Sequence, residues 1–278
     1  QPANGTLTGT APNLIYIPNN GYTGSDSFSF KASDGTTDSL PAIISIQVES
    51  VPLPPIDDAE FVPPIGIPAP EFGITQTHHM YATAKYDFGN GPEAYRNAGD
   101  GPYTHYVDNT SSNATDSNNP FGTKDRPRRT IPTDYLKAGS VVEIHGGPYS
   151  AGILAMCGNG TKTAPVIFRG PSTGKKPILS GGVRLRGSYI NGENFDMSSA
   201  GLTWSTGAPI SNAALRFCNI HGGGGLGLNV ASFSGDPVKN IVVYKNKVYD
   251  KGNINSTTDE DATGIAVNAG VSYCWILD

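Results

Sequence analysis

The residue types best suited to chemistry gather towards the C-terminal end of the sequence. Lys245 and Lys247 carry amines, and a lysine base can remove the proton beside the carboxylate of a uronic acid. That reaction also needs a cation to neutralise the carboxylate, and acidic side chains can hold one. The sequence therefore predicts a Ca²⁺ site in the same region. Its predicted ligands are Asp250, Asp259, Glu260 and Asp261.

Two further catalytic candidates flank Asn219. Arg216 precedes it and His221 follows it, and a positioned histidine acts as an acid or a base near neutral pH. Aromatic rings beside these residues offer stacking faces to sugars. The predicted catalytic set is Lys245, Lys247, Arg216 and His221. The predicted substrate-binding set is Tyr244, Tyr249 and Lys251.

Each of these residues also has a structural interpretation. An outward strand face is normally polar, and the acids at 259–261 are typical of a solvated loop. A histidine beside a glycine turn is more often a hydrogen-bonding corner residue, and tyrosines commonly pack against the ends of a solenoid. The acids do not match the spacing of an EF-hand loop, so a Ca²⁺ site would need ligands from neighbouring coils.

Composition narrows the class of protein. The chain has 278 residues, with 19 Lys and Arg against 24 Asp and Glu and a formal net charge of -5, so we expect no nucleic-acid partner. No apolar run is long enough to span a bilayer, and no membrane insertion is expected. Three cysteines are too few for a disulfide scaffold and are expected as buried thiols. They are Cys157, Cys218 and Cys274.

Short β-branched runs recur through the second half of the chain. Such a run cannot bury its apolar face alone, so each must stack on the next. The even spacing of Ile144, Ile167 and Ile190 predicts a right-handed parallel β-helix, a solenoid of the all-β class. The runs are 141–144, 165–168, 188–190, 214–217, 241–244 and 264–267. A second register, with side chains stacked at one corner, is predicted for Asn194, Asn219 and Asn246.

Residues 1–50 have a different pattern. Alternating apolar runs between Gly, Asn and Asp turns predict a strand meander, in which Asp26, Asp34 and Asp38 cap turns rather than bind Ca²⁺. The segment resembles bacterial cadherin-like, immunoglobulin-like (Ig-like) repeats, which implies an extracellular β-sandwich, here a partial one that starts partway through its strands. The motifs that carry the resemblance are PANGTL (2–7), YIP (16–18), GSDSF (24–28) and DG (34–35).

A proline-rich stretch at 51–70 predicts a stiff, extended linker. The remainder, 71–278, is expected to hold the N-terminal cap and the first coils of the β-helix, with more coils beyond the last residue. Within it, residues 71–104 are rich in Tyr, Gly, Asn and His without periodicity. We expect them to pack irregularly against the first coil.

From residue 106 to 278 the chain resembles secreted pectate-lyase-like β-helix proteins. The resemblance implies a first strand, a loop, a short helix that caps the open end of the barrel, and then the first coil. The motifs that carry it are YVDN (106–109), FGT (121–123), PRRTI (127–131), AGSVV (138–142), GPY (147–149), APVI (164–167) and KPILSG (176–181).

That fold hosts several activities and does not name one. The leading prediction is a secreted or cell-surface polysaccharide lyase, or a fragment of one, that performs β-elimination on an acidic polysaccharide with Ca²⁺. The alternative is a noncatalytic surface protein that adheres or binds glycans, in which the charges of 245–261 do not converge. A glycoside hydrolase is the third possibility, with Asp250 and Asp261 as its carboxylate pair.

Overall fold

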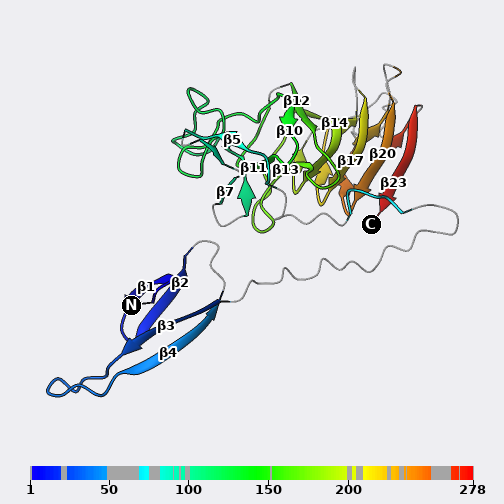
Figure 1. Ribbon diagram of the computed structural model, residues 1–278. Helices are drawn as coiled ribbons and strands as arrows, with labels where there is room; N and C mark the ends of the chain where they lie inside the picture. Colours follow the sequence, from blue (N-terminus) through cyan, green and yellow to red (C-terminus); the bar gives the residue numbers. More distant parts are fainter. Residues whose placement is uncertain are drawn as a thin grey trace. The chain divides into compact units, whose positions relative to one another are not determined.

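The chain divides into two compact units, residues 1–60 and 61–278, and the boundary falls inside the predicted linker. Within the described residues there is no helix, hence none long and apolar enough to cross a membrane. The predicted all-β class is confirmed. The computed structural model in Figure 1 describes residues 2–19, 24–48, 69–74, 82–89, 91–93, 95–97, 101–150, 152–198, 202–204, 209–223, 227–231, 235, 237–251, 264–268 and 270–277.

The first unit consists of two antiparallel hairpins. Strand β1 (Gly5–Thr10) pairs with β2 (Asn13–Pro18), and β3 (Gly24–Phe30) pairs with β4 (Ala42–Val48). The alternating pattern of the sequence predicts β2, β3 and β4. It does not single out β1, which carries the first motif of the Ig-like resemblance.

Asp26 connects the two hairpins. Its carboxylate accepts hydrogen bonds from the backbone N–H groups of Ala3 and Asn4, at 3.0 and 2.8 Å, and from the Tyr16 hydroxyl at 2.7 Å. The Ser27 N–H adds a fourth at 2.8 Å. Desolvation raises the pKa of this carboxyl, but the four hydrogen bonds outweigh it and lower the pKa of Asp26 to about 2. An ionised Asp26 therefore ties β3 to β2 and to the segment before β1.

Asp34 caps the turn between β3 and β4, as predicted. Its Oδ1 accepts the backbone N–H groups of Thr37 and Thr36, both at 2.8 Å, and these bonds lower the pKa of Asp34. Asp38 forms an exposed ion pair with Lys31 at 3.8 Å. Neither carboxylate needs a cation to explain its position.

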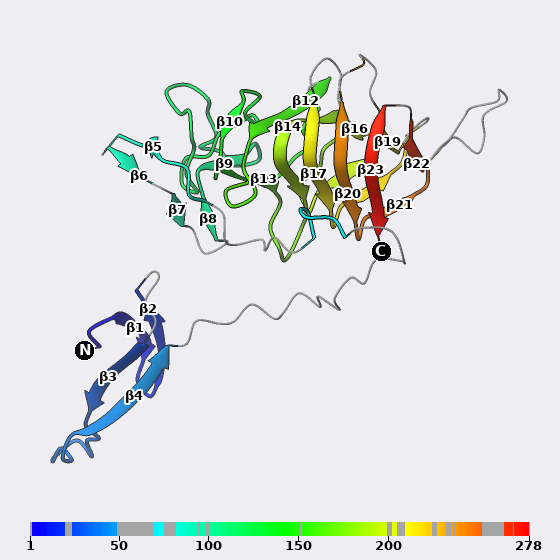
Figure 2. The same cartoon turned by 45° about the vertical axis from the view of Figure 1, so that its right-hand side comes forward.

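The second unit is built on parallel strands that lie side by side (Figure 2). They form three ladders, in each of which a strand pairs with its counterpart further along the chain. The first ladder contains, in spatial order, β9 (His105–Asp108), β11 (Val141–His145), β13 (Val166–Arg169), β14 (Gly182–Glu193), β17 (Ile210–Arg216), β20 (Val238–Tyr244) and β23 (Val271–Leu277).

The second ladder shares the long strand β14 with the first. It contains β10 (Leu136–Lys137), β12 (Ile153–Asn159), β14, β16 (Leu202–Trp204), β19 (Leu228–Val230) and β22 (Ile265–Val267). The third contains β15 (Asp196–Ser198), β18 (Asn219–His221) and β21 (Lys247–Tyr249). Four short strands form antiparallel pairs before the ladders: β5 (Tyr86–Asp87), β6 (Pro92–Glu93), β7 (Arg96–Asn97) and β8 (Pro102–Tyr103).

One buried cluster joins the three ladders. It includes Phe168 from the first, Leu185 from the shared strand β14 and Met197 from the third, all fully buried. Full burial of an apolar side chain of this size stabilises the folded state by about 1.5–3 kcal/mol. Two of the three cysteines follow the prediction: Cys157 and Cys218 are buried, and burial raises the pKa of Cys218 to about 12, whereas Cys274 is only half-buried.

The first ladder has one face towards the buried cluster and one face away from it. The face that points away is covered by the chain that precedes the ladder. We call the described residues from 69 to 103 the strap. Ile74 of the strap packs with Ala214, Val242 and Trp275, and Ala82 belongs to a second cluster with Ile167. The expected irregular packing of this segment is therefore found, but it reaches the late strands β17, β20 and β23 as well as the first ones.

The register of the first ladder differs from the predicted one. Val141 lies beside Ile167, and Ile167 lies beside Asn191, so the equal spacing of three isoleucines does not mark one register. The run 264–267 pairs with β19 in the second ladder, and β23 takes the predicted place beside β20. Loops of unequal length between strands make the chain distance between paired strands vary, so sequence spacing misjudges the pairing.

The predicted stack of three asparagines at one corner is also wrong. The third ladder places Asn219 beside Asp196 and Lys247, which leaves Asn194 and Asn246 at two other positions. Asn246 does bond the turn backbone, since it accepts the Cys218 N–H at 2.8 Å. The expected capping helix is absent from residues 101–150, all of which are described and which form strands and turns.

The contact of Gly73 with the first ladder gives a test of the strap. Gly73 has φ +99°, and a Cβ there would lie 2.7 Å from Ala214 Cβ and 3.0 Å from Val242 Cβ. Gly89 has a similar φ, +103°, with nothing within 4 Å, so it is a matched control. Gly73→Ala should reduce the free energy of unfolding by about 1–3 kcal/mol more than Gly89→Ala, because only it is overpacked. Denaturation followed by tryptophan fluorescence measures both, and equal losses would contradict this packing.

Candidate functional site

The structure divides the predicted site residues between two faces. Arg216 and Tyr244 belong to the first ladder, on the side that the strap covers, and both are buried. Lys245 follows at the corner, with φ 50° and its Nζ 5.2 Å from the centre of the Tyr244 ring. His221, Lys247 and Tyr249 belong to the third ladder. The predicted catalytic set is therefore not one cluster.

Arg216 ends a buried row of alternating charges. Register places Glu143, Arg169, Glu193 and Arg216 on successive strands of the first ladder. The Nε of Arg169 donates to Glu143 and the Nε of Arg216 donates to Glu193, each at 2.5 Å. All four side chains are at most 1% exposed. We call these four residues the charge ladder.

The arginines of the charge ladder also hold the strap. Arg169 Nη2 donates to the Pro102 carbonyl at 2.8 Å, and Arg216 Nη1 donates to the carbonyls of Gly73 and Ile74 at 3.4 and 3.3 Å. The guanidinium of Arg216 is thus enclosed between Glu193 and the strap. Arg216 therefore stabilises the fold, and a substrate in solvent has no access to its guanidinium group.

Glu143 links the charge ladder to the surface. Its Oε1 contacts His145 Nε2 at 3.1 Å, and its Oε2 pairs with Arg169. Burial raises the pKa of Glu143, but the hydrogen bond from His145 and the charge of Arg169 outweigh it and leave the pKa lowered. The His145 ring also stacks on Tyr106, with centroids 4.9 Å apart and an interplanar angle of 15°.

The third ladder presents the other group of predicted residues on one side. His221 and Tyr249 are register partners, and their rings stack at 4.9 Å with an angle of 9°. Lys247 lies two residues before Tyr249, so both side chains point to the same side of β21. Between them, Val248 packs against the core. We call this outward side of β15, β18 and β21 the open face.

Asp196 is a member of the open face that sequence reasoning misses. Its Oδ1 lies 2.7 Å from His221 Nε2, and both side chains are about one-third exposed. Asp196 is 25 residues before His221, and only the register of β15 with β18 brings them together. A constant number of residues between paired strands would have revealed this pair from the sequence. The loops differ in length, so no such constant spacing exists.

Two lysines border the open face. Lys176, which sequence reasoning also misses, donates from Nζ to the Phe217 carbonyl at 2.5 Å and reaches Asn219 Oδ1 at 3.5 Å. Lys251 donates to the Gly222 carbonyl at 2.6 Å, and desolvation lowers its pKa. With Lys247, they give the open face more positive than negative charge.

The predicted Ca²⁺ ligands are only partly described. Asp250 is exposed, with φ 52°, while Asp259, Glu260 and Asp261 lie outside the described residues. In the part of the chain that the structure describes, no group of three His, Cys, Asp or Glu side chains is arranged to hold a metal ion. The described residues alone do not fit a Ca²⁺ site. The predicted carboxylate pair of a hydrolase also includes Asp261 and remains a prediction.

The arrangement of the open face suits a sugar chain. Because the two rings stack on each other, the ring face of Tyr249 that is turned away from His221 is the one that can stack on a sugar, and the lysines beside it can pair with negative groups. The His221–Asp196 pair adds a group that can transfer a proton. The face thus combines three features on adjacent strands that are held in register by backbone hydrogen bonds.

Comparison with known families bears on the first unit. Residues 1–47 match a family described as Bacterial Ig domain, in agreement with the Ig-like resemblance and with the two hairpins. No curated protein and no solved structure matches the chain. The first unit is therefore similar to bacterial Ig domains, and the open face must be interpreted from its own geometry.

The charge ladder predicts a large effect of a single truncation. Arg216→Ala removes the Nε–H group that pairs with the buried Glu193 and frees two strap carbonyls, so the free energy of unfolding should fall by about 3–5 kcal/mol. Lys239→Ala, an exposed lysine on the adjacent strand β20, is the matched control and should change it by less than about 0.5 kcal/mol. Urea denaturation measures both. Similar values for the two variants would show that Arg216 is solvated.

Proposed function

We propose that residues 101–277 form a right-handed parallel β-helix. Support comes from the three ladders, in which strands far apart in the chain pair in parallel around one buried cluster. Parallel strands need a long connection, and here most of the connections supply strands of the other ladders. A solenoid of this kind presents long outer faces suited to extended ligands.

The function that the open face supports best is binding of an acidic polysaccharide. The observation that carries this proposal is the stacked pair of His221 and Tyr249, with Lys247 on the same side of the strand. A sugar ring stacks on the face of Tyr249 that is turned away from His221, while its carboxylate or sulfate pairs with a lysine. The positive charge of this face contrasts with the formal net charge of -5 of the whole chain.

A location at the bacterial surface or outside the cell fits this function. The first unit is similar to bacterial Ig domains, which are often found in extracellular or surface proteins. Residues 51–68 are rich in proline, a composition typical of linkers in modular proteins. A glycan-binding surface protein uses such an arrangement.

Removal of the stacking surface tests the proposal. Tyr249→Ala should raise the dissociation constant for tetragalacturonate about fivefold to tenfold, because an aromatic stacking contact is lost. Tyr135→Ala is a matched control, since Tyr135 is 49% exposed and Tyr249 43% exposed, and Tyr135 lies outside the open face. Isothermal titration calorimetry measures both. Unchanged affinity in Tyr249→Ala would remove the open face from the proposal.

A second candidate, polysaccharide lyase activity, is favoured by the His221–Asp196 pair. If His221 Nε2–H donates to Asp196, Nδ1 is the proton acceptor. It would take the proton from the carbon beside a uronate carboxylate as the neighbouring glycosidic C–O bond breaks and a C=C bond forms, and the departing oxygen would take up a proton from water. A lysine of the open face would offset the charge that develops on the carboxylate. Lys245, at a different corner, has no place in this scheme.

The lyase candidate predicts unsaturated uronate ends, which absorb ultraviolet light. Incubation with pectate or alginate should raise the absorbance, and His221→Ala should lower the rate at least about 100-fold because the base is lost. Lys239→Ala should leave the rate unchanged. A chelator arm tests the predicted Ca²⁺ dependence. No absorbance from any substrate, with binding intact, would leave the protein a noncatalytic glycan binder.

A further inference from the structure

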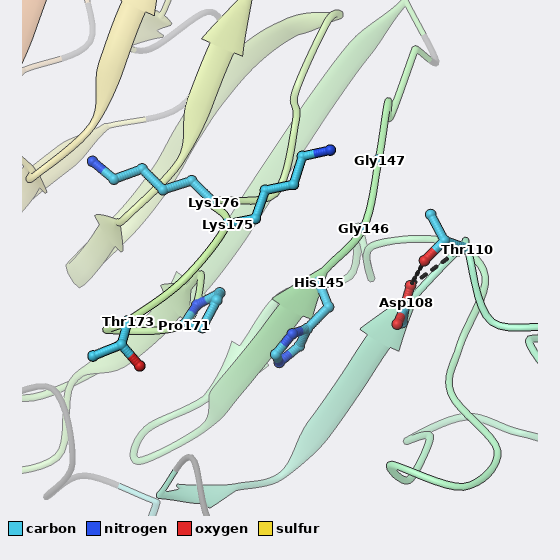
Figure 3. Close-up of a pocket in the computed structure, with 9 residues that line it drawn as sticks. All are labelled: Asp108, Thr110, His145, Gly146, Gly147, Pro171, Thr173, Lys175 and Lys176. Carbon is cyan, nitrogen blue, oxygen red and sulfur yellow. Dashed lines mark hydrogen bonds between the residues drawn. The ribbon is translucent and has the colours of Figure 1, made fainter.

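A pocket of about 410 Å³ opens beside the first ladder, away from the His221–Tyr249 pair. It lies between the corner after β11 and the loop 171–176, and Figure 3 shows the side chains that line it. His145 and Asp108 come from the corner side, and Lys175 and Lys176 come from the loop. Lys175 is the cation that the pocket offers, because the Nζ of Lys176 donates to the Phe217 carbonyl instead.

The acidic member of the pocket is already engaged. Asp108 Oδ1 accepts the backbone N–H of Thr110 at 2.9 Å and its hydroxyl at 2.6 Å, as the dashed lines in Figure 3 indicate. Asp108 therefore acts as a turn cap. Lys175 keeps its charge for another partner.

One wall of the pocket is fixed by the charge ladder. His145 stacks on Tyr106 and contacts Oε1 of Glu143, whose other oxygen pairs with the buried Arg169. A side chain held on two sides keeps its orientation when a ligand arrives, which lowers the entropic cost of binding. The pocket is thus lined on this side by a preorganised imidazole rather than by a mobile surface side chain.

The other wall connects the pocket to the open face. The side chains of Lys175 and Lys176 extend in opposite directions in Figure 3. Lys176 reaches the Phe217 carbonyl and Asn219 of β18, and Ile178, two residues later, pairs with Asp196 of β15. An extended chain lying on the open face can therefore continue along the loop into the pocket.

We propose that this pocket binds an anionic substituent, a carboxylate or a sulfate, of the glycan that occupies the open face. This inference rests on the proposed function and adds a second contact point to it. Lys175 supplies the charge, His145 supplies a positioned ring, and Lys176 joins the two contact points. The ligand is consequently a chain of several sugars with anionic groups on more than one of them.

Lys175→Gln tests the pocket, because Lys175 is exposed and the change removes its charge while keeping a long polar side chain. The probes are tetragalacturonate and a sulfated chondroitin tetrasaccharide, with maltotetraose as the neutral control. For at least one anionic probe, Lys175→Gln should raise the dissociation constant about threefold to fivefold, the range of a partly screened ion pair. The stronger effect identifies a carboxylate or a sulfate. Lys239→Gln, on β20, is the matched control and should leave both constants unchanged.

The outcomes separate the pocket from the open face. If Lys175→Gln and Tyr249→Ala both weaken binding, the chain contacts both. If only Tyr249→Ala weakens it, the pocket inference is overturned and the proposed function stands. If only Lys175→Gln weakens it, the pocket binds the anion and the open face does not. If the unaltered protein binds neither anionic probe, or binds maltotetraose equally, both proposals fail.

Discussion

The second unit depends on a buried row of alternating charges. Glu143, Arg169, Glu193 and Arg216 lie on neighbouring strands at the spacing of a parallel sheet, so each charge has an opposite one beside it. Burial of one such charge alone would be very unfavourable. In the ladder, the carboxylates accept hydrogen bonds from the arginines, and the arginines also satisfy strap carbonyls. The row therefore fixes the strand register and the position of the strap together.

This constraint decides which face of the unit is available for ligands. The first ladder has apolar and charged side chains on its outer side, and without the strap it would expose Ala214, Val242 and Trp275. The strap closes that side. The third ladder has no such cover among the described residues, and its outward side chains are polar or aromatic. The closed face supports the fold, and the side chains of the open face stay accessible to solvent.

Sequence reasoning predicts the strands better than their pairing. The β-branched runs at 141–144 and 241–244 are strands of the first ladder, as expected. The register is missed because the connections differ in length, and with it the Asp196–His221 pair, which no local motif announces. Arg216 is misjudged for another reason: an arginine on an outward strand position suggests solvent, and only a distant segment, the strap, reveals that it is buried.

The same residues show why the pocket and the charge ladder are related. His145 belongs to the outward row that continues from Glu143, so its position follows from the register that the charge ladder sets. The His145 side chain lies at the end of β11, beyond the part of the ladder that the strap covers. There it forms one wall of the pocket. A change in the strand register would move His145 to the other side of the sheet and remove this wall. The ionic row buried under the strap thus also determines the shape of a surface that a glycan can reach.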